Sequence, residues 1–277
     1  MSVLVTGGTG KTGRRLAARL ADLGQAVRIA ARHPPAGPQG RRLDWSDRDS
    51  WDSALEGVSG LYLVPSSVAA EITAMIEFMG LALDRGVRRF VLLSASLLPA
   101  GGPGAGLAHQ WLRDNAAEWA VLRPSWFMQN FSEGPHRETI RAEDRIYTAA
   151  GDGKVAFISA DDIAGAACAA LTAPRAINTD VILTGPEAIS YDTAAAMIGQ
   201  AIGRAIIHVR LSVDDLAARH RDRGLPPATA QILAGMDTLI AGGAEDRVTT
   251  GVETLTGEPP TPFDRFCRQN AQAWRRA

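Results

Sequence analysis

The clearest chemical signal in the chain is a glycine-rich stretch, Thr6-Gly7-Gly8-Thr9-Gly10-Lys11-Thr12-Gly13. It lies between a short apolar run and a segment with helical spacing. Glycines at positions 7, 10 and 13 allow a sharp turn, a close approach of backbone N–H groups to a pyrophosphate, and tight packing of helix on strand. The pattern predicts a dinucleotide-binding turn, whose predicted cofactor contacts are Gly7, Thr9, Gly10, Lys11, Thr12 and Gly13.

Two other interpretations of this stretch are possible. Gly10-Lys11-Thr12 is similar to the end of a phosphate-binding P-loop, but that motif needs a glycine five residues before Gly10, where the chain has Val5. The other alternative is a glycine turn with a purely structural role.

The end of the second apolar run bears on which dinucleotide would bind. Enzymes that use NAD usually have an acidic residue there, which binds the ribose 2′-OH. This run ends in Arg32-His33 with no acid nearby. A guanidinium binds a 2′-phosphate through charge-assisted hydrogen bonds, so Arg32 predicts NADP(H), with Lys11 or Arg14 as additional contacts. The alternative is a solvated arginine at a strand end.

These residues must be positioned by the elements around them. Residues 3–5, 26–31, 60–64, 90–93 and 120–122 are short, continuous apolar runs, as in a parallel sheet covered on both faces. Segments with helical periodicity separate them. The alternation predicts an α/β fold, a Rossmann-type doubly wound parallel sheet.

After Pro124 the pattern becomes mostly helical. Helices are predicted over residues 161–171, 191–202, 213–223 and 229–240, and strands over 155–158, 181–183 and 206–209. We therefore expect a dinucleotide-binding core at 1–125 and a smaller substrate-binding lobe at 126–277, part of which returns to the sheet. The glycine-rich residues 100–106 follow a strand end, and are either a mobile cover over the site or a surface connection.

Composition limits the class of protein. The 29 basic and 30 acidic residues give a net charge of -1, which argues against a nucleic-acid binder. The two distant cysteines form neither a disulfide framework nor a zinc-binding motif, and fit a reducing compartment. No apolar run approaches the ~20 residues that span a bilayer. We expect a cytoplasmic protein, a monomer or homodimer, whose partner is a small-molecule substrate.

Several motifs together resemble a known family. They are the glycine turn, the strand end at Arg32, and the stretches Arg42-Leu43-Asp44-Trp45, Leu61-Tyr62-Leu63-Val64-Pro65, Leu92-Leu93-Ser94-Ala95-Ser96 and Leu122-Arg123-Pro124-Ser125-Trp126-Phe127-Met128-Gln129-Asn130-Phe131. The family is the NmrA-like atypical short-chain dehydrogenases. The chain looks most similar to the ergot-alkaloid-type, agroclavine-synthase-like branch, whose members reduce iminium ions.

The resemblance also implies roles for individual residues. Asp44 would contact the adenine, the loop from Pro65 would pass along the cofactor, and Pro124 would lie near the nicotinamide. The substrate pocket would be walled by Trp126, Phe127, Met128 and Phe131. On physical grounds these apolar residues could equally well attach the lobe to the sheet.

The usual proton donor of short-chain dehydrogenases is missing from the sequence. Their Tyr-x-x-x-Lys pair protonates a carbonyl oxygen, but none of the three tyrosines here has a lysine four residues on. His109 stands about where the lysine would be. This argues against simple ketone reduction, whereas an iminium ion accepts hydride and becomes a neutral amine without a proton donor.

Candidate catalytic residues follow from this departure. His109 could act as an acid toward a conjugated C=C bond or a quinone, and Ser94 could orient the substrate. Trp111 and Trp126 could offer aromatic faces to a cation. The alternatives are a partly exposed helix histidine for His109 and a strand-end serine that satisfies backbone groups for Ser94.

Other titratable clusters have simpler explanations. Asp161-Asp162 and Asp214-Asp215 are typical of helix N-termini, His220 lies in a charged run, and the remaining histidines lack metal-ligand spacing. The leading hypothesis is an NADPH-dependent reductase that transfers hydride to a small, fairly apolar metabolite. The reduced group is expected to be an iminium or an activated C=C bond in preference to a ketone or quinone. The alternatives are a non-catalytic NADP(H)-sensing regulator and a cofactor-assisted isomerase or epimerase.

Overall fold

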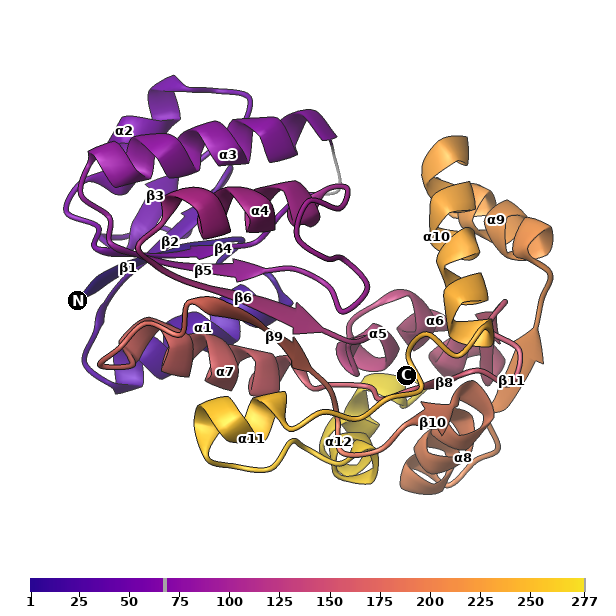
Figure 1. Ribbon diagram of the computed structural model, residues 1–277. Helices are drawn as coiled ribbons and strands as arrows, with labels where there is room; N and C mark the ends of the chain where they lie inside the picture. Colours follow the sequence, from indigo (N-terminus) through magenta and orange to yellow (C-terminus); the bar gives the residue numbers. More distant parts are fainter. Residues whose placement is uncertain (67–68, 277) are drawn as a thin grey trace. The chain divides into compact units, whose positions relative to one another are not determined.

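A computed structural model describes residues 1–66 and 69–276 (Figure 1). The chain forms two compact units. Unit 1 is drawn from residues 1–124, 160–183 and 251–258, and unit 2 from residues 125–159, 184–250 and 259 onward. Residues 160–183 and 251–258 belong to the C-terminal lobe in the division expected from the sequence, and the structure includes them in unit 1.

Unit 1 is built on a seven-stranded sheet in which every pairing is parallel. Its order is β3-β2-β1-β4-β5-β6-β9, which reverses direction between β1 and β4. The predicted doubly wound α/β fold is therefore confirmed. The strands are β1 (Ser2–Thr6), β2 (Ala26–Ala31), β3 (Gly40–Arg42), β4 (Gly60–Leu63), β5 (Arg89–Leu93), β6 (Glu118–Pro124) and β9 (Thr179–Leu183).

Helices cover both faces of this sheet. Helices α1 (Lys11–Asp22) and α7 (Ala160–Thr172) pack against each other on one face, and α3 (Ala69–Asp84) packs against α4 (Ala105–Asn115) on the other (Figure 1). The two remaining helices of unit 1 are α2 (Asp49–Leu55) and α11 (Gly251–Thr256). Strands covered on both faces must be apolar throughout, and all four residues of β4 are buried.

The glycine-rich residues before α4 form a hydrogen-bonded series of turns. The N–H of Gly101 donates to the carbonyl of Gly106 at 2.9 Å, and the N–H of Gly102 donates to the carbonyl of Pro99 at 3.1 Å. These bonds give the segment a defined conformation, while its action as a mobile cover stays a prediction.

Unit 2 is mostly helical and has two small sheets. Strand β7 (Arg145–Thr148) pairs in parallel with β11 (Ile207–Arg210), and β8 (Lys154–Val155) pairs antiparallel with β10 (Ile189–Ser190). The helices are α5 (Gln129–Ser132), α6 (Pro135–Glu143), α8 (Tyr191–Ile202), α9 (Val213–Asp222), α10 (Pro227–Ala241), α12 (Phe263–Asn270) and the short 3₁₀ helix η1 (Ala271–Trp274). The sequence patterns predicted α8, α9 and α10 and did not predict α5, α6 or β7.

Aromatic rings form the core of unit 2. Phe131 packs edge-on against Phe157, with 5.1 Å between ring centroids, and against Phe263, at 5.3 Å. The indole N–H of Trp274 donates to the carbonyl of Phe131 at 2.7 Å, so the end of the chain is fastened to this core. Edge-to-face contacts of this kind contribute about 0.5–1.5 kcal/mol each beyond burial.

The hairpin of α9 and α10 has a small core of its own. Three buried residues fill it: Leu216, Ala217 and Ala234. Ile232 and Leu239 on α10 stay exposed. The end of α10 is anchored elsewhere, because Ile240 belongs to the aromatic core and Asp237 accepts a hydrogen bond from the N–H of Ala149.

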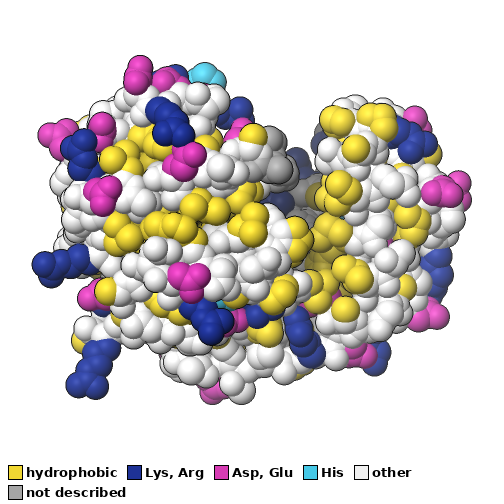
Figure 2. Space-filling model, turned by 45° about the horizontal axis from the view of Figure 1, so that its top comes forward, with side chains coloured by type: hydrophobic (Ala, Val, Ile, Leu, Met, Phe, Trp, Pro, Cys, Tyr) yellow, Lys and Arg dark blue, Asp and Glu magenta, His cyan; other side chains and the backbone are white. Residues whose placement is uncertain are grey.

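Two features are absent from the part of the chain that the structure describes. No helix of the described residues is long and apolar enough to span a bilayer. Within the same residues no group of three or more His, Cys, Asp or Glu side chains is placed to hold a metal ion. Figure 2 shows basic and acidic side chains interspersed on the face in view.

A half-buried histidine makes the stability of unit 2 depend on pH. The ring of His136 stacks on Phe131 at 5.2 Å, and burial, aided by the charge of Arg223, lowers the pKa of His136 to about 3. In the unfolded chain its pKa is near 6.5. The unfolded state therefore binds the proton first, so this contribution to stability is complete above about pH 6.5 and is lost as the pH falls toward 3.

We predict that His136→Phe removes part of the acid sensitivity. Between pH 7 and pH 4.5 the unaltered protein should lose roughly 1–2 kcal/mol more of its free energy of unfolding than the variant does, after allowance for the partial exposure of the ring. Urea titrations followed by tryptophan fluorescence at both pH values measure the difference. His33→Gln, at an exposed position, is the control, and an equal loss in all three proteins would contradict the prediction.

Candidate functional site

The predicted dinucleotide-binding turn joins β1 to α1 and depends on a very close backbone approach. Gly7 has a φ of +58°, in the left-handed region that favours glycine. A Cβ on Gly13 would lie 2.3 Å from the carbonyl oxygen of Gly7 and 2.7 Å from the Cα of Gly8. No residue with a side chain fits at position 13 unless the backbone moves.

The start of α1 has the properties of an anion site. Gly7, Thr9 and Gly10 are exposed at the turn, Gly10 caps the helix without a side-chain hydrogen bond, and the first helical turn contains no acidic residue. Lys11 is half-buried there, and its carbonyl accepts a hydrogen bond from Arg15 at 2.8 Å. The helix dipole favours negative charge at this end, so the turn fits a pyrophosphate.

Two hydroxyl contacts fix the turn to the neighbouring strand β4. The hydroxyl of Thr6 accepts a hydrogen bond from the N–H of Val64 at 2.8 Å. The buried hydroxyl of Tyr62 donates to the hydroxyl of Thr12 at 3.1 Å. Burial raises the pKa of Tyr62 above its ordinary value, so the phenol stays neutral. Thr12, predicted as a cofactor contact, is 4% exposed and holds the base of the turn.

The end of β2 places a positive charge beside an acidic residue. Arg32 is exposed directly after β2. The carboxylate of Asp44 accepts hydrogen bonds from the hydroxyl of Ser46 at 2.7 Å and from its N–H at 3.0 Å. These bonds, and then the charges of Arg42 and Arg32, lower the pKa of Asp44. Arg32 and Asp44 therefore lie close enough to interact, as expected if both contact the same adenosine.

The strands β4, β5 and β6 end near one another in the sheet and carry three more predicted residues. The N–H of Ser94 donates to the carbonyl of Leu122 at 2.7 Å, while its buried hydroxyl has no hydrogen-bond partner among the described residues. Pro124 closes β6, and its carbonyl accepts from the N–H of Ser96 at 2.9 Å. Pro65 is half-buried after β4, and the loop from it runs into residues 67–68, outside the described ones.

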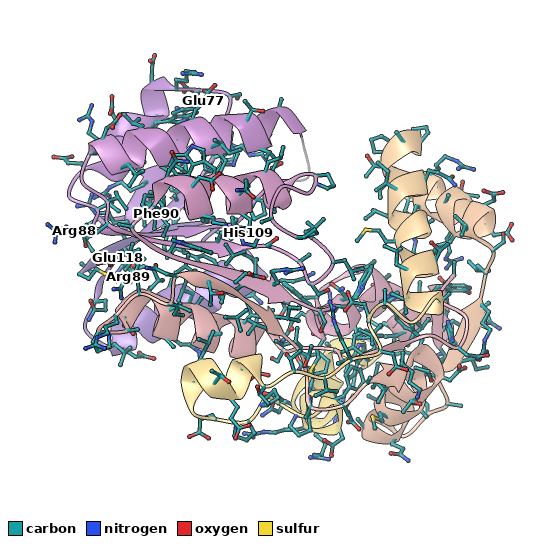
Figure 3. All side chains as sticks on the ribbon, viewed as in Figure 1. Glu77, Arg88, Arg89, Phe90, His109 and Glu118 are labelled. Atoms are coloured by element: carbon teal, nitrogen blue, oxygen red, sulfur yellow. The ribbon has the colours of Figure 1, made fainter. Side chains whose placement is uncertain are left out.

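His109 lies between α4 and the sheet, where it is 2% exposed (Figure 3). Its Nε2 is 3.9 Å from the carboxylate of Asp180, and its Nδ1 has no hydrogen-bond partner in the described part of the chain. Burial lowers its pKa and outweighs the attraction of Asp180, with help from the charge of Arg123. The ring is therefore neutral at pH 7, which makes it a weak acid, and its role as proton donor stays a prediction.

An arginine that the sequence analysis missed organises the same region. Arg123 on β6 pairs with Asp180 on β9 at 2.7 Å and donates to the carbonyl of Ser96 at 2.7 Å. It thereby fastens the segment after β5 to the edge of the sheet. Arg123 lies in the Leu122-Arg123-Pro124 stretch that supports the family resemblance. Its partner Asp180 is 57 residues away, so the sequence does not reveal the ion pair.

Trp111, predicted as a substrate contact, packs between helices. A Cβ built on Gly80 of α3 would lie 3.9 Å from Cζ2 of Trp111, and the indole packs against the apolar core under α3 and α4. The structure therefore gives Trp111 a role in packing within unit 1.

Unit 2 contains a cavity of about 340 Å³ with aromatic walls. Rings of Trp126, Tyr147 and Tyr191 line it, together with His136, and Asp237 supplies a carboxylate. Helices α9 and α10 also line the cavity, through residues such as Leu216 and Leu233. Most of the lining surface is apolar, although polar and charged side chains also line it, and a cavity of this size and character is typical of small-molecule sites.

Of the four residues predicted to wall a substrate pocket, Trp126 lines this cavity. Met128 and Phe131 have no exposed surface and belong to the core of unit 2, and Phe127 is half-buried after β6. Phe131 lies behind the wall, because it stacks on His136. His220, expected in a solvated run, is half-buried and lines the cavity.

Comparisons with known proteins agree with this geometry. Residues 7–174 match the model of a family described as NAD(P)H-binding. The chain is 42% identical to agroclavine dehydrogenase of Claviceps fusiformis over 99% of both chains. It is 39% identical to festuclavine dehydrogenase of Aspergillus fumigatus over the whole of both chains. The solved structure of the NADPH-dependent quinone oxidoreductase QOR2 of Escherichia coli with NADPH has a TM-score of 0.80 at 25% identity, covering 97% of this chain and 99% of that one.

The sheet topology and the glycine turn define a Rossmann-type fold, and the family match and the relatives show an NAD(P)H-binding oxidoreductase. The chain belongs to the NAD(P)H-binding family matched above, and its predicted place among the NmrA-like reductases, next to the clavine dehydrogenases, is confirmed.

We predict that Gly13→Ala disrupts the turn. The new Cβ forces the helix away from Gly7, which should cost roughly 2 kcal/mol or more of stability and weaken NADPH binding by at least about tenfold. Thermal unfolding and NADPH fluorescence titration measure the two effects. Gly235→Ala is the control, because a Cβ at that position in α10 meets no atom within 4 Å. Unchanged NADPH affinity in Gly13→Ala would contradict the prediction.

Proposed function

We propose that the protein is an NADPH-dependent reductase that delivers hydride to an iminium or conjugated C=C bond of a small, fairly apolar molecule. The observation that carries this proposal is the glycine turn, whose geometry accommodates a pyrophosphate at the N-terminus of α1. The relatives named as agroclavine and festuclavine dehydrogenases support a reductase of this kind.

The choice of NADPH over NADH rests on the end of β2. Arg32 is exposed there, and the acidic residue that would accept hydrogen bonds from a ribose 2′-OH is absent from that strand end in the sequence. A guanidinium offers two parallel hydrogen bonds to a phosphate. The solved NADPH complex of QOR2 supports the same preference.

The proposed choice of reducible bond rests on the proton balance. The reduced nicotinamide supplies a hydride when it is bound. An iminium carbon that accepts hydride yields a neutral amine, so no side chain has to donate a proton. A ketone would yield an alkoxide, and the neutral, buried His109 is poorly suited to protonate it. Reduction of a C=C bond or quinone would need a proton from His109 or water, with Ser94 orienting the substrate.

We predict that Arg32→Asp changes the cofactor preference. NADPH affinity should fall by at least about tenfold, because the carboxylate repels the 2′-phosphate, while NADH affinity changes by less than about threefold. Calorimetric titration with each coenzyme measures both. Arg88→Asp is a matched control, because Arg88 is exposed next to the opposite end of the strands, beside the start of β5 (Figure 3). Equal losses for the two coenzymes would rule out the 2′-phosphate contact.

The reaction itself is tested by following NADPH oxidation with four substrate types: cyclic iminium ions, conjugated enones, quinones and simple ketones. We expect iminium ions to be reduced fastest and ketones slowest, by a factor of about a hundred or more. Gly13→Ala serves as the inactive control. Tight NADPH binding without oxidation by any substrate would instead identify an NADP(H)-sensing protein, and product formation without net NADPH loss would identify an isomerase.

A further inference from the structure

The cavity of unit 2 contains a buried carboxylate. Asp237 lies on α10, is 6% exposed and lines the cavity together with Trp126 and Tyr191. Its Oδ2 accepts a hydrogen bond from the N–H of Ala149 at 2.8 Å. No arginine, lysine or histidine among the described residues forms an ion pair with it. A charge buried in apolar surroundings is costly unless an opposite charge compensates it.

We propose that Asp237 selects the substrate by charge, pairing with a cationic nitrogen of an ammonium or iminium ion held beside the ring of Trp126. This inference rests on the proposed function and adds to it the residue that recognises the substrate's charge. The positive charge of the substrate compensates the negative charge of Asp237, with which no basic side chain among the described residues forms an ion pair. Aromatic rings add to the attraction, since their faces carry negative charge density.

The arginines of the cavity wall are engaged elsewhere. Arg219 donates hydrogen bonds of 2.9 Å to both carboxylate oxygens of Glu143, and its guanidinium lies 3.6 Å from the ring centroid of Tyr147. The hydroxyl of Tyr147 also donates to Glu143, at 2.7 Å. Arg223 is exposed and donates to the carbonyl of Pro135 at 3.3 Å. The positive charge of Arg219 is thus balanced. The charge of Arg223 lowers the pKa of His136 in the cavity wall, but it is not among the causes that shift the pKa of Asp237.

The remaining titratable groups near α10 do not supply a cation to Asp237 at neutral pH. Burial lowers the pKa of both His136 and His220, which are therefore neutral. Burial raises the pKa of Tyr191, and the negative charges of Asp237 and Glu245 raise it further. A neutral phenol and two neutral imidazoles leave the carboxylate of Asp237 without a positive partner.

Lys154 is the basic residue of β8, which packs on α10, and it lies 3.9 Å from the carboxylate of Asp246.

Burial raises the pKa of Asp237 to about 6, despite its hydrogen bond with Ala149. The carboxyl group is therefore mostly ionised above about pH 7 and mostly protonated near pH 5. Cation binding should follow that titration.

The experiment uses three phenyl probes of matched shape and different charge: phenethyltrimethylammonium, (3,3-dimethylbutyl)benzene and 4-phenylbutanoate. The first has a fixed positive charge that does not titrate, and the second is its neutral carbon isostere. Binding to the full chain is measured by ligand-detected NMR at about pH 7.5. We expect the cation to bind at least about tenfold more tightly than the neutral probe, and the carboxylate to bind most weakly.

Two variants assign that preference to the carboxylate. Asp237→Asn keeps an oxygen that can accept the hydrogen bond of Ala149, and it should reduce cation affinity about tenfold while neutral-probe affinity changes by less than about twofold. Asp214→Asn, at an exposed position in the first turn of α9, should have no effect. In the unaltered protein, cation affinity should fall about tenfold from pH 7.5 to pH 5, and in Asp237→Asn it should not change.

Equal binding of the cationic and neutral probes, or tightest binding of 4-phenylbutanoate, would overturn the inference. So would an unchanged cation affinity in Asp237→Asn. Failure of this inference and failure of the proposed function are distinguishable. If NADPH oxidation by neutral enones or quinones persists while no cation preference is found, the reductase proposal stands alone. If the cation preference is found but no substrate oxidises NADPH, the charge recognition stands alone.

Discussion

The contact of Gly13 with the backbone of Gly7 is the constraint on which the candidate cofactor site depends. With no Cβ at position 13, α1 begins directly against the end of β1, and the start of the helix is left exposed. The hydroxyls of Thr6 and Tyr62 then fix this turn to β4, at the point where the strand order reverses. Ligands bind at such a reversal because the crossover helices diverge there and leave an open crevice.

Much of this unit could be predicted from sequence because its strands are buried on both faces. Residues 3–5 and 60–63 are continuous runs without a charged residue, and both lie in buried strands in the structure. The edge strand β3 was missed, since Gly40–Arg42 is short and polar and its place in the sheet comes from pairing with β2. In unit 2, β7 was missed for the same reason: two of its four residues are not buried, and its pairing partner β11 is about 60 residues away.

The candidate substrate residues show a different limit of sequence reasoning. Trp126 and Phe131 are both large apolar residues after the same strand, but Trp126 faces the cavity and Phe131 lies in the core behind it. An apolar side chain has the same sequence signal in either place. Asp237 shows the converse case, because a single acid within a helical pattern predicts a solvent-facing position, whereas the fold buries this one in the cavity wall, where it accepts a hydrogen bond from the N–H of Ala149.

The candidate cofactor site of unit 1 and the cavity of unit 2 carry charges of opposite sign. The exposed Arg32 offers a positive charge where a 2′-phosphate is expected, and salt screens such an interaction. Asp237 is negative and buried, so its interaction with a cation is screened much less. A buried carboxylate raises the energy of the empty cavity, and at a pH where Asp237 is ionised a cation that enters the cavity offsets this cost. A neutral molecule of the same shape does not recover it. Hydride transfer to the proposed iminium substrate would remove its positive charge, so the neutral amine would lose the attraction to Asp237 until it binds a proton.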